Sequence, residues 1–249
     1  MNIIGAPVNP GKSCQSFMNI RLDRFLSNNT SLTRSEAQRA IRTGRVRVGE
    51  IPVNDPAFKV GEGTSVRYEG IELGKRQSRY FMLNKPAGVV CATRDGKHRT
   101  VLDLIPCDER EGLHPVGRLD KDTTGLVILT DDGDWSHRVT SPRRHCAKVY
   151  RVGLVEPLPE SARLALEQGI ELRGERRPTL PAKVETLGML EIRLSIQEGK
   201  YHQVKRMLAA VGNHVVSLRR ESIGTISLDP ALPPGAYRPL SADEVASIG

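Results

Sequence analysis

The segment from His114 to Gly133, HPVGRLDKDTTGLVILTDDG, places a carboxylate where it can do chemistry. Asp120 follows Arg118 by two positions and opens a polar loop that runs to residue 125. The apolar run 126–130 comes next and is closed by residues 131–133, a pattern typical of a buried strand followed by a hairpin-type turn. A carboxylate between cations, on a loop fixed to a rigid strand, is suited to act as a nucleophile, acid or base.

Two other interpretations of Asp120 stay open from the residues alone. Asp and Thr before a strand often form turns by binding their own backbone, which needs no catalytic role. Alternatively, Asp120, Asp122 and Asp131 supply carboxylates for a two-metal nuclease site, whose activity a chelator would abolish. For Asp122 we expect a hydrogen-bonding role within the loop.

Two further segments carry candidate site residues. Residues 148–152, KVYRV, alternate like a strand and place Tyr150 on one of its faces, where a half-buried structural tyrosine is the plain alternative. Within residues 198–207, EGKYHQVKRM, apolar spacing that starts at Val204 predicts a helix. Lys205 and Arg206 are adjacent on that helix and point about 100° apart, so only one of them can face a given partner.

Several elements are expected to position these segments. Residues 80–84 and 89–93 flank Lys-Pro-Ala-Gly and are expected to pair as a β-hairpin. The remaining elements of this half of the chain are strands expected at 190–196 and 215–218 and helical segments expected at 101–105, 135–141 and 161–168.

Arginine is concentrated near the start of the chain. Residues 18–49 hold seven arginines against two acidic residues, a net charge of +5 within a total of +8. Apolar spacing predicts a helix from Leu22 and a second helix that is capped by Thr33 and Glu36 and ended by Gly44, with strands at 45–48 and 64–68. The clustering favours a nucleic-acid surface. We expect phosphate contacts from Arg21, Arg34, Arg39, Arg42, Arg45 and Arg47.

Net charge, cysteine spacing and hydropathy exclude several classes of protein. The 249-residue chain has a net charge of +8, which suits a polyanionic partner. Its four cysteines form no C-x-x-C pair, so neither a disulfide framework nor a zinc ribbon is expected, and His137, His145 and Cys146 are an incomplete metal-ligand set. No apolar run approaches a membrane span and the N-terminus lacks a signal-peptide core, so we expect a cytoplasmic protein. Residues 1–17 are expected to form a flexible tail.

These segments together resemble a known enzyme family. GRLDKDTTGLVILTDDG is similar to the signature of pseudouridine synthases of the RsuA type, and the N-K-P-x-G, K-x-Y-x-V and EGKYHQVKRM segments resemble its other motifs. Residues 18–73 resemble the S-four-type RNA-binding domain. The resemblance implies an α+β fold in which this domain and a linker at 74–79 precede a catalytic domain at 80–249, with a mixed, mainly antiparallel sheet and flanking helices.

The resemblance also implies a site and a reaction. Asp120 is then the catalytic carboxylate, and Lys205, or else Arg206, lies beside it and favours its ionised form. Tyr150 belongs to the same catalytic set and stacks on the extruded uracil, while Arg118 fills the gap in the RNA or holds phosphate. If Lys205 is the partner of Asp120, Arg206 is expected to bind the RNA by facing a phosphate. No cofactor or metal is expected, because isomerising uridine to pseudouridine is redox-neutral and transfers no external group.

The expected substrate is a uridine of 16S ribosomal RNA within a small-subunit assembly intermediate, modified by a monomeric enzyme. RHC-x-K-x-Y and YHQVKRM-x-AAVGNHVV, which begin at Arg144 and Tyr201, look closest to the enzyme that modifies this RNA. A large-subunit (23S) enzyme of the same family and a non-catalytic RNA-binding or assembly factor stay as alternatives. The residues leave open which uridine is modified and whether Asp120 attacks C1′ or removes a proton from C2′.

Overall fold

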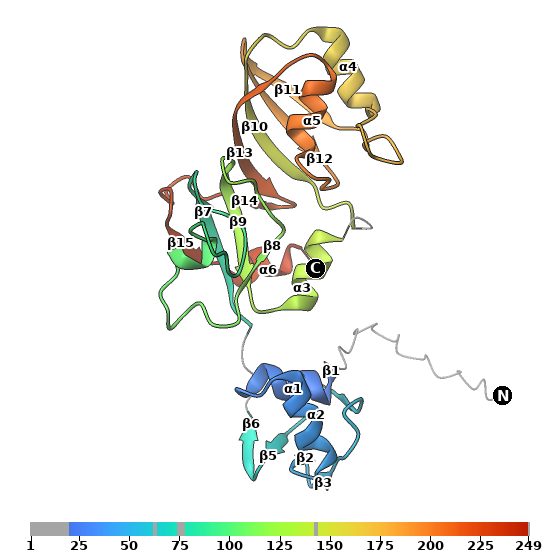
Figure 1. Cartoon of the computed structure of the whole chain (residues 1–249), viewed down its shortest axis with the longest axis vertical. Helices are drawn as coiled ribbons and strands as arrows, with labels where there is room; N and C mark the ends of the chain where they lie inside the picture. The colour runs from blue at the N-terminus through green and yellow to red at the C-terminus, as the bar shows by residue number, and fades with distance from the viewer. Residues whose placement is uncertain (1–19, 62–63, 74–77, 142–143, 249) are drawn as a thin grey trace, which may run out of the picture. The chain divides into compact units, whose positions relative to one another are not determined.

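The chain forms two compact units, residues 1–77 and 78–249, whose helices and strands are labelled in Figure 1. The computed structural model describes residues 20–61, 64–73, 78–141 and 144–248. The expected tail at 1–17 and residues 74–77 of the expected linker lie outside the described residues.

Two short helices build the core of the first unit. α1 (Leu22–Asn29) and α2 (Arg34–Arg42) bury Leu22, Leu26 and Ile41 completely. The predicted capping box is present, because Thr33 Oγ1 accepts a hydrogen bond from the Glu36 backbone and the Glu36 carboxylate accepts one from the Thr33 backbone. Gly44 follows α2 with φ +73°, the left-handed conformation that favours glycine. Both predicted helices are confirmed.

Small antiparallel sheets complete the first unit. One sheet has the strand order β3-β2-β5-β6, and β1 pairs with β4. β2 (Val46–Val48) and β5 (Val66–Tyr68) lie where strands were predicted, and both contribute valines to the core beneath the helices. The other strands are β1 (Ile20–Arg21), β3 (Ile51–Pro52), β4 (Lys59–Val60) and β6 (Ile71–Leu73).

A nine-stranded sheet organises the second unit, with the order β11-β12-β10-β13-β9-β7-β15, while β14 pairs with β13 and β8 with β9. Among the strands of this sheet that the structure describes, only β13 and β9 pair in parallel, so the predicted mixed, mainly antiparallel sheet is confirmed. The strands are β7 (Tyr80–Lys85), β8 (His114–Val116), β9 (Thr124–Thr130), β10 (Lys148–Leu154), β11 (Lys183–Gly188), β12 (Glu191–Ile196), β13 (Val215–Ile223), β14 (Ile226–Ser227) and β15 (Tyr237–Pro239).

Helices cover the two faces of this sheet at different ends. Figure 1 shows α4 (Glu160–Gln168) and α5 (Gln203–Ala210) in its upper part, near β10 and β12. Leu166 of α4 and Met207 of α5 belong to a core that includes residues of these two strands. α3 (Gly133–Thr140) and α6 (Ala242–Ala246) pack near β7 and β9, where Trp135 is buried. A 3₁₀ helix, η1 (Val101–Leu104), lies where a short helix was predicted.

Two predictions of local hairpins are wrong. Residues 80–84 belong to β7, which pairs with β9 and β15, whereas residues 89–93 contribute only an isolated bridge between Val90 and Thr100. After β9, the Asp132 side chain accepts hydrogen bonds from the backbones of Asp134 and Trp135 and so caps α3. The turn signal at 131–133 therefore begins a helix rather than a hairpin, because Asp is equally suited to both positions.

Candidate active site

Asp120 lies on the loop between β8 and β9, and 26% of its side-chain surface is exposed. Two groups from the start of α5 approach its carboxylate from a distant part of the sequence. Lys205 Nζ lies 3.3 Å from Asp120 Oδ2, and His202 Nε2 lies 3.3 Å from Asp120 Oδ1. The structure thus brings together two of the predicted site residues, Asp120 and Lys205, with a basic neighbour on each carboxylate oxygen.

Lys205 also binds Asp122, with contacts of 2.7 and 2.8 Å to the two carboxylate oxygens. Burial by itself would lower the pKa of Lys205, but the hydrogen bonds with Asp122 and Asp120 outweigh it and raise the pKa above its ordinary value. The hydrogen bond from Lys205 lowers the pKa of Asp122. Lys205 is therefore a cation throughout the neutral pH range and links the two carboxylates of the loop.

His202 is a site residue that sequence reasoning missed. It precedes α5 in the left-handed conformation, with φ +47° and ψ +37°, and its ring stacks on that of Tyr201. A left-handed conformation is costly for a residue with a side chain and persists where the surroundings enforce it. The sequence indicated only that His202 lies near the start of a helix. Its contact with Asp120 could not be predicted, because that contact depends on how strands distant in the sequence pair.

Lys85 at the end of β7 anchors the backbone of the loop that carries Asp120. Its side chain is completely buried, and Nζ donates to the carbonyls of Pro86, Lys121 and Thr123 at 3.0, 3.2 and 2.6 Å. Burial lowers the pKa of Lys85, yet three acceptors require the three N–H donors of the protonated form. The end of β7 is thereby tied to the backbone on both sides of Asp122, next to Asp120.

The glycine of the Thr124-Gly125 pair is required by the packing of β9 against β13. Gly125 has φ +98°, and a Cβ there would lie 2.3 Å from the Arg220 carbonyl, where β9 and β13 pair in parallel. Arg220 is almost fully buried and donates from Nε to the Leu126 carbonyl at 2.8 Å. Only glycine allows this close approach, which fixes the β9 end of the loop.

Arg206 and Lys205 point in different directions, as their adjacency required. Arg206 Nη1 lies 2.9 Å from Glu175, and its side chain also donates to the carbonyls of Tyr201 and Arg173. It therefore ties the loop after α4 to the start of α5. Of the two candidate partners for Asp120, the structure places Lys205 beside it.

Tyr150 and Arg118 are near the motif but do not bind Asp120. Tyr150 is only 8% exposed and lies opposite Arg220 of β13 and Leu194 of β12, within the core. Arg118 is exposed, and its side chain makes no hydrogen bond or ion pair with any residue that the structure describes.

The predicted RNA-binding arginines of the first unit fall into two groups. Arg21 and Arg34 pair with the buried Asp23 at 2.9 and 3.4 Å. Arg45 pairs with Glu69 and stacks over Tyr68, and Arg47 lies 3.9 Å from Glu50. Arg39 and Arg42 are exposed on α2, with side chains that have no such partner among the described residues. Of the predicted set, these are the two whose side chains no carboxylate of the described residues neutralises.

The alternative metal sites are not assembled within the described residues. No three His, Cys, Asp or Glu side chains there gather to hold a metal ion. Asp131, considered with Asp120 and Asp122 for a nuclease, follows the far end of β9 and binds Arg79 at 2.9 Å. The two-metal arrangement is therefore not formed by these three carboxylates.

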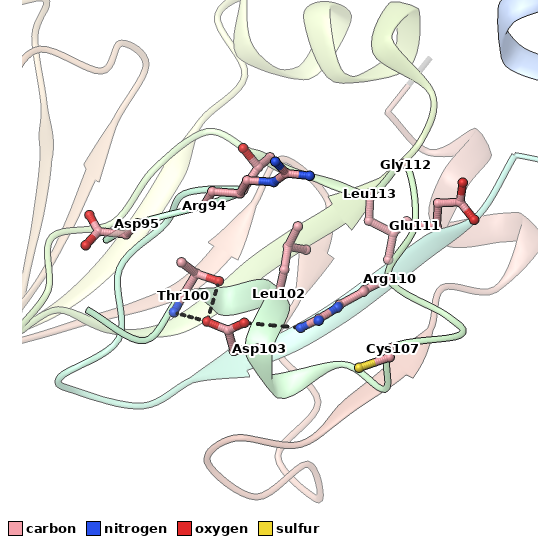
Figure 2. Close-up of a pocket in the computed structure, with 11 residues that line it drawn as sticks. Arg94, Asp95, Thr100, Leu102, Asp103, Cys107, Arg110, Glu111, Gly112 and Leu113 are labelled. Carbon is pink, nitrogen blue, oxygen red and sulfur yellow. Dashed lines mark hydrogen bonds and ion pairs between the residues drawn. The ribbon is translucent and has the colours of Figure 1, made fainter. Parts of the chain in front are cut away.

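A separate open hollow of about 760 Å³ lies around η1 and the loop before β8 (Figure 2). Its lining includes Asp103, which binds Thr100 and Arg110, as the dashed lines in Figure 2 show. None of the predicted site residues lines this hollow. It is a different feature from the Asp120 site.

Comparison with known proteins decides the family. The family model described as RNA pseudouridylate synthase matches residues 79–210, more than half of the chain and all of the Asp120 site. The chain belongs to this family. An S4 domain model matches residues 20–66 of this synthase, so the first unit is an RNA-binding module of that type.

Named relatives extend over most of this synthase. It is 49% identical to the ribosomal small subunit pseudouridine synthase A of Vibrio cholerae serotype O1, over 92% of its own length and 99% of the relative's. It is 50% identical to the protein of the same name from Escherichia coli K12, over 92% and 100%. A crystal structure of a pseudouridylate synthase, 45% identical, aligns with a TM-score of 0.69 over 92% of this chain and all of that one.

In the described part of the synthase, no helix has both the length and the apolar character needed to cross a membrane.

Proposed function

We propose that this synthase isomerises one uridine of small-subunit (16S) ribosomal RNA to pseudouridine, with Asp120 as the reactive carboxylate. One observation carries the assignment of the residue. Asp120 is a partly exposed carboxylate with Lys205 and His202 each 3.3 Å from one of its oxygens. The names of relatives about 50% identical over 92% of the chain support the choice of RNA.

The geometry suits the chemistry that this reaction needs. The Asp120 carboxylate either attacks C1′ of the ribose or removes the proton from C2′, and the bond between C1′ and N1 of uracil breaks with its electron pair going to the base. The uracil then turns and C5 bonds to C1′, which releases the Asp120 carboxylate from C1′ in the first route and is accompanied by return of the proton to C2′ in the second. The proton on C5 is lost and N1 takes up a proton, so the product is an isomer of the substrate. Lys205 Nζ, 3.3 Å from Asp120 Oδ2, gives the carboxylate a positive neighbour and holds its orientation. The reaction is redox-neutral.

We assign Tyr150 and Arg118 different roles in binding the RNA. The Tyr150 ring, mostly buried beside Arg220, is a fixed surface on which the extruded uracil stacks. Arg118 is exposed two residues before Asp120 and is free to bind a phosphate or to occupy the space that the uridine leaves. Arg206 acts indirectly in this scheme, because it positions the start of α5 through Tyr201 and Glu175.

The first unit adds affinity for RNA. Arg39 and Arg42 are exposed without intramolecular partners among the described residues, so they can release counterions from phosphates on binding. Arg21, Arg34, Arg45 and Arg47 already hold carboxylates, so a phosphate contact from any of these four must compete with an existing ion pair. The synthase acts as a cytoplasmic monomer on a small-subunit assembly intermediate in this proposal.

Mapping of pseudouridine in ribosomal RNA tests the function. RNA from cells with and without the gene is compared, with the wild-type gene returned as the control. We expect one 16S site to disappear and to return on complementation. A lost site in 23S RNA instead would transfer the activity to the large subunit, and unchanged maps would favour a non-catalytic RNA-binding factor. Protein-free 16S RNA and partly assembled particles, compared as substrates in vitro, test the assembly stage.

A further inference from the structure

An exposed aromatic ring lies beside the candidate active site and has no part in the roles assigned so far. Tyr201 keeps 76% of its surface exposed, although tyrosine usually buries most of its large apolar area. The next residue, His202, places Nε2 at 3.3 Å from Asp120 Oδ1. The ring of Tyr201 is therefore carried by the neighbour of a group that touches the reactive carboxylate.

The orientation of this ring is fixed by stacking. The ring centroids of Tyr201 and His202 are 3.8 Å apart, and the ring planes differ by 19°. Because the His202 ring covers one face while three quarters of Tyr201 is exposed, the opposite face of the tyrosine ring is open to solvent. The result is a flat aromatic surface with one supported face and one open face.

The backbone beneath the ring is fixed as well. Arg206 Nη1 donates to the Tyr201 carbonyl at 3.0 Å and also binds Glu175 of the loop after α4 at 2.9 Å. That loop carries Arg173, Arg176 and Arg177, which are exposed and whose side chains have no ion-pair partner within the described residues. An open aromatic ring next to unpaired arginines is the combination that binds single-stranded nucleic acid, by stacking and by phosphate contact.

The proposed reaction creates a need for such a surface. A uridine that is extruded from RNA leaves its neighbours without a stacking partner, which costs a few kcal/mol. We propose that the open face of Tyr201 stacks on the nucleobase adjoining the target uridine, and so holds the RNA strand while the uridine lies at Asp120. This inference rests on the proposed function. It assigns to Tyr201 a substrate contact distinct from the uracil-stacking role of Tyr150.

Two substitutions separate the ring from the hydroxyl. Tyr201→Phe keeps the ring and should retain wild-type kcat/KM, whereas Tyr201→Leu removes the ring and should lower kcat/KM by roughly 5- to 150-fold, the range for one base–aromatic stack. Met189→Ala is the matched control, because Met189 is also highly exposed but lies in the turn between β11 and β12. It should leave kcat/KM unchanged.

A modified RNA distinguishes stacking from a purely structural effect. The substrate is the shortest RNA on which the wild-type chain makes pseudouridine, prepared with either the 5′ or the 3′ neighbour of the target lacking its base. For one of the two positions, the wild type should lose the same factor that Tyr201→Leu loses on normal RNA. The Leu variant should lose nothing more on that RNA, because the two changes remove one contact.

The outcomes separate the two claims. If the wild type makes no pseudouridine in any ribosomal RNA, the proposed function fails and this inference fails with it. If the wild type is active but Tyr201→Leu matches it, the stacking role alone is refuted. An equal loss for Tyr201→Leu on normal and both base-free RNAs would likewise overturn it, since the ring would then only support His202.

Discussion

Replacement of Lys85 by methionine should remove most of the activity without unfolding the chain. The change deletes three hydrogen bonds, of 2.6, 3.0 and 3.2 Å, to backbone carbonyls around the Asp120 loop, while methionine keeps the apolar stem in its place. Hydrogen bonds from a charged donor contribute about 1.5–3 kcal/mol each when buried. The loss of stability is smaller than the sum of three such bonds for two reasons. Only the hydrogen bond to Thr123 is fully buried, and the variant no longer has to remove a charged ammonium from water when it folds. We therefore expect a loss of about 2–3 kcal/mol in the free energy of unfolding.

The effect on turnover should exceed the effect on binding. The carbonyls of Lys121 and Thr123 flank Asp122, and Lys121 follows Asp120 directly, so losing their anchor displaces the carboxylate from Lys205 and His202. A displacement of about 1 Å can cost on the order of 100-fold in rate. We expect kcat to fall by about that factor and KM to change little, because the exposed arginines of α2 are untouched.

Release of tritium from 16S RNA labelled at C5 of uridine measures kcat and KM, since the C5 proton is lost in the reaction, and urea unfolding measures stability. Lys121→Met is the matched control. It removes an exposed lysine from the same loop and keeps the backbone carbonyl that Lys85 binds. Wild-type turnover for Lys85→Met, or an equal loss for Lys121→Met, would refute the anchoring role.

Three further changes test other parts of the structure. Lys205→Met should lower kcat far more than Arg206→Met, because Lys205 contacts Asp120 whereas Arg206 binds Glu175. Steady-state kinetics of both variants check this, and the reverse order would contradict it. Asp23→Asn should lower the free energy of unfolding of the first unit by about 2 kcal/mol at pH 7. The hydrogen bond from Arg21 holds the pKa of Asp23 below its usual range, so this stabilisation is full above about pH 4 and is lost as the pH falls through that lower pKa; urea unfolding of both proteins at pH 7 and at low pH should show the difference shrinking in acid. The double variant Arg39→Gln/Arg42→Gln should reduce the slope of log affinity against log salt by about 1–2, as expected for two lost phosphate contacts; an unchanged slope in filter-binding titrations would exclude α2 from the RNA surface.

The parts of the fold that depend on local patterning were predictable. The capping box at Thr33 and Glu36 and the apolar face that begins at Val204 define α2 and α5, because both signals involve residues within one or two helical turns. The hairpin predicted for residues 80–93 failed for the opposite reason. β7 finds its partners in β9 and β15, which lie far along the chain, and no local pattern specifies such a pairing.

The candidate site shows the same division. Asp120 and Lys205 were found through motifs that resemble those of a family, and the structure brings them to 3.3 Å. The roles of Lys85 and His202 could not be found, because a fully buried lysine and a left-handed histidine are consequences of tertiary packing. A polar residue on a loop is readily assigned a function from the sequence. A buried lysine that binds only backbone carbonyls gives no comparable signal.

Replacement of Asp120 by asparagine is the sharpest test of whether this residue is the reactive carboxylate. The change removes the reactive carboxylate, keeps the size of the side chain, and leaves Lys205 bound to Asp122. Pseudouridine formation and RNA affinity are measured for the variant and the wild type on the same 16S RNA. We expect isomerisation to fall to a trace while the dissociation constant for RNA stays within a few-fold of the wild-type value. Pseudouridine formation by Asp120→Asn at a rate near that of the wild type would contradict it.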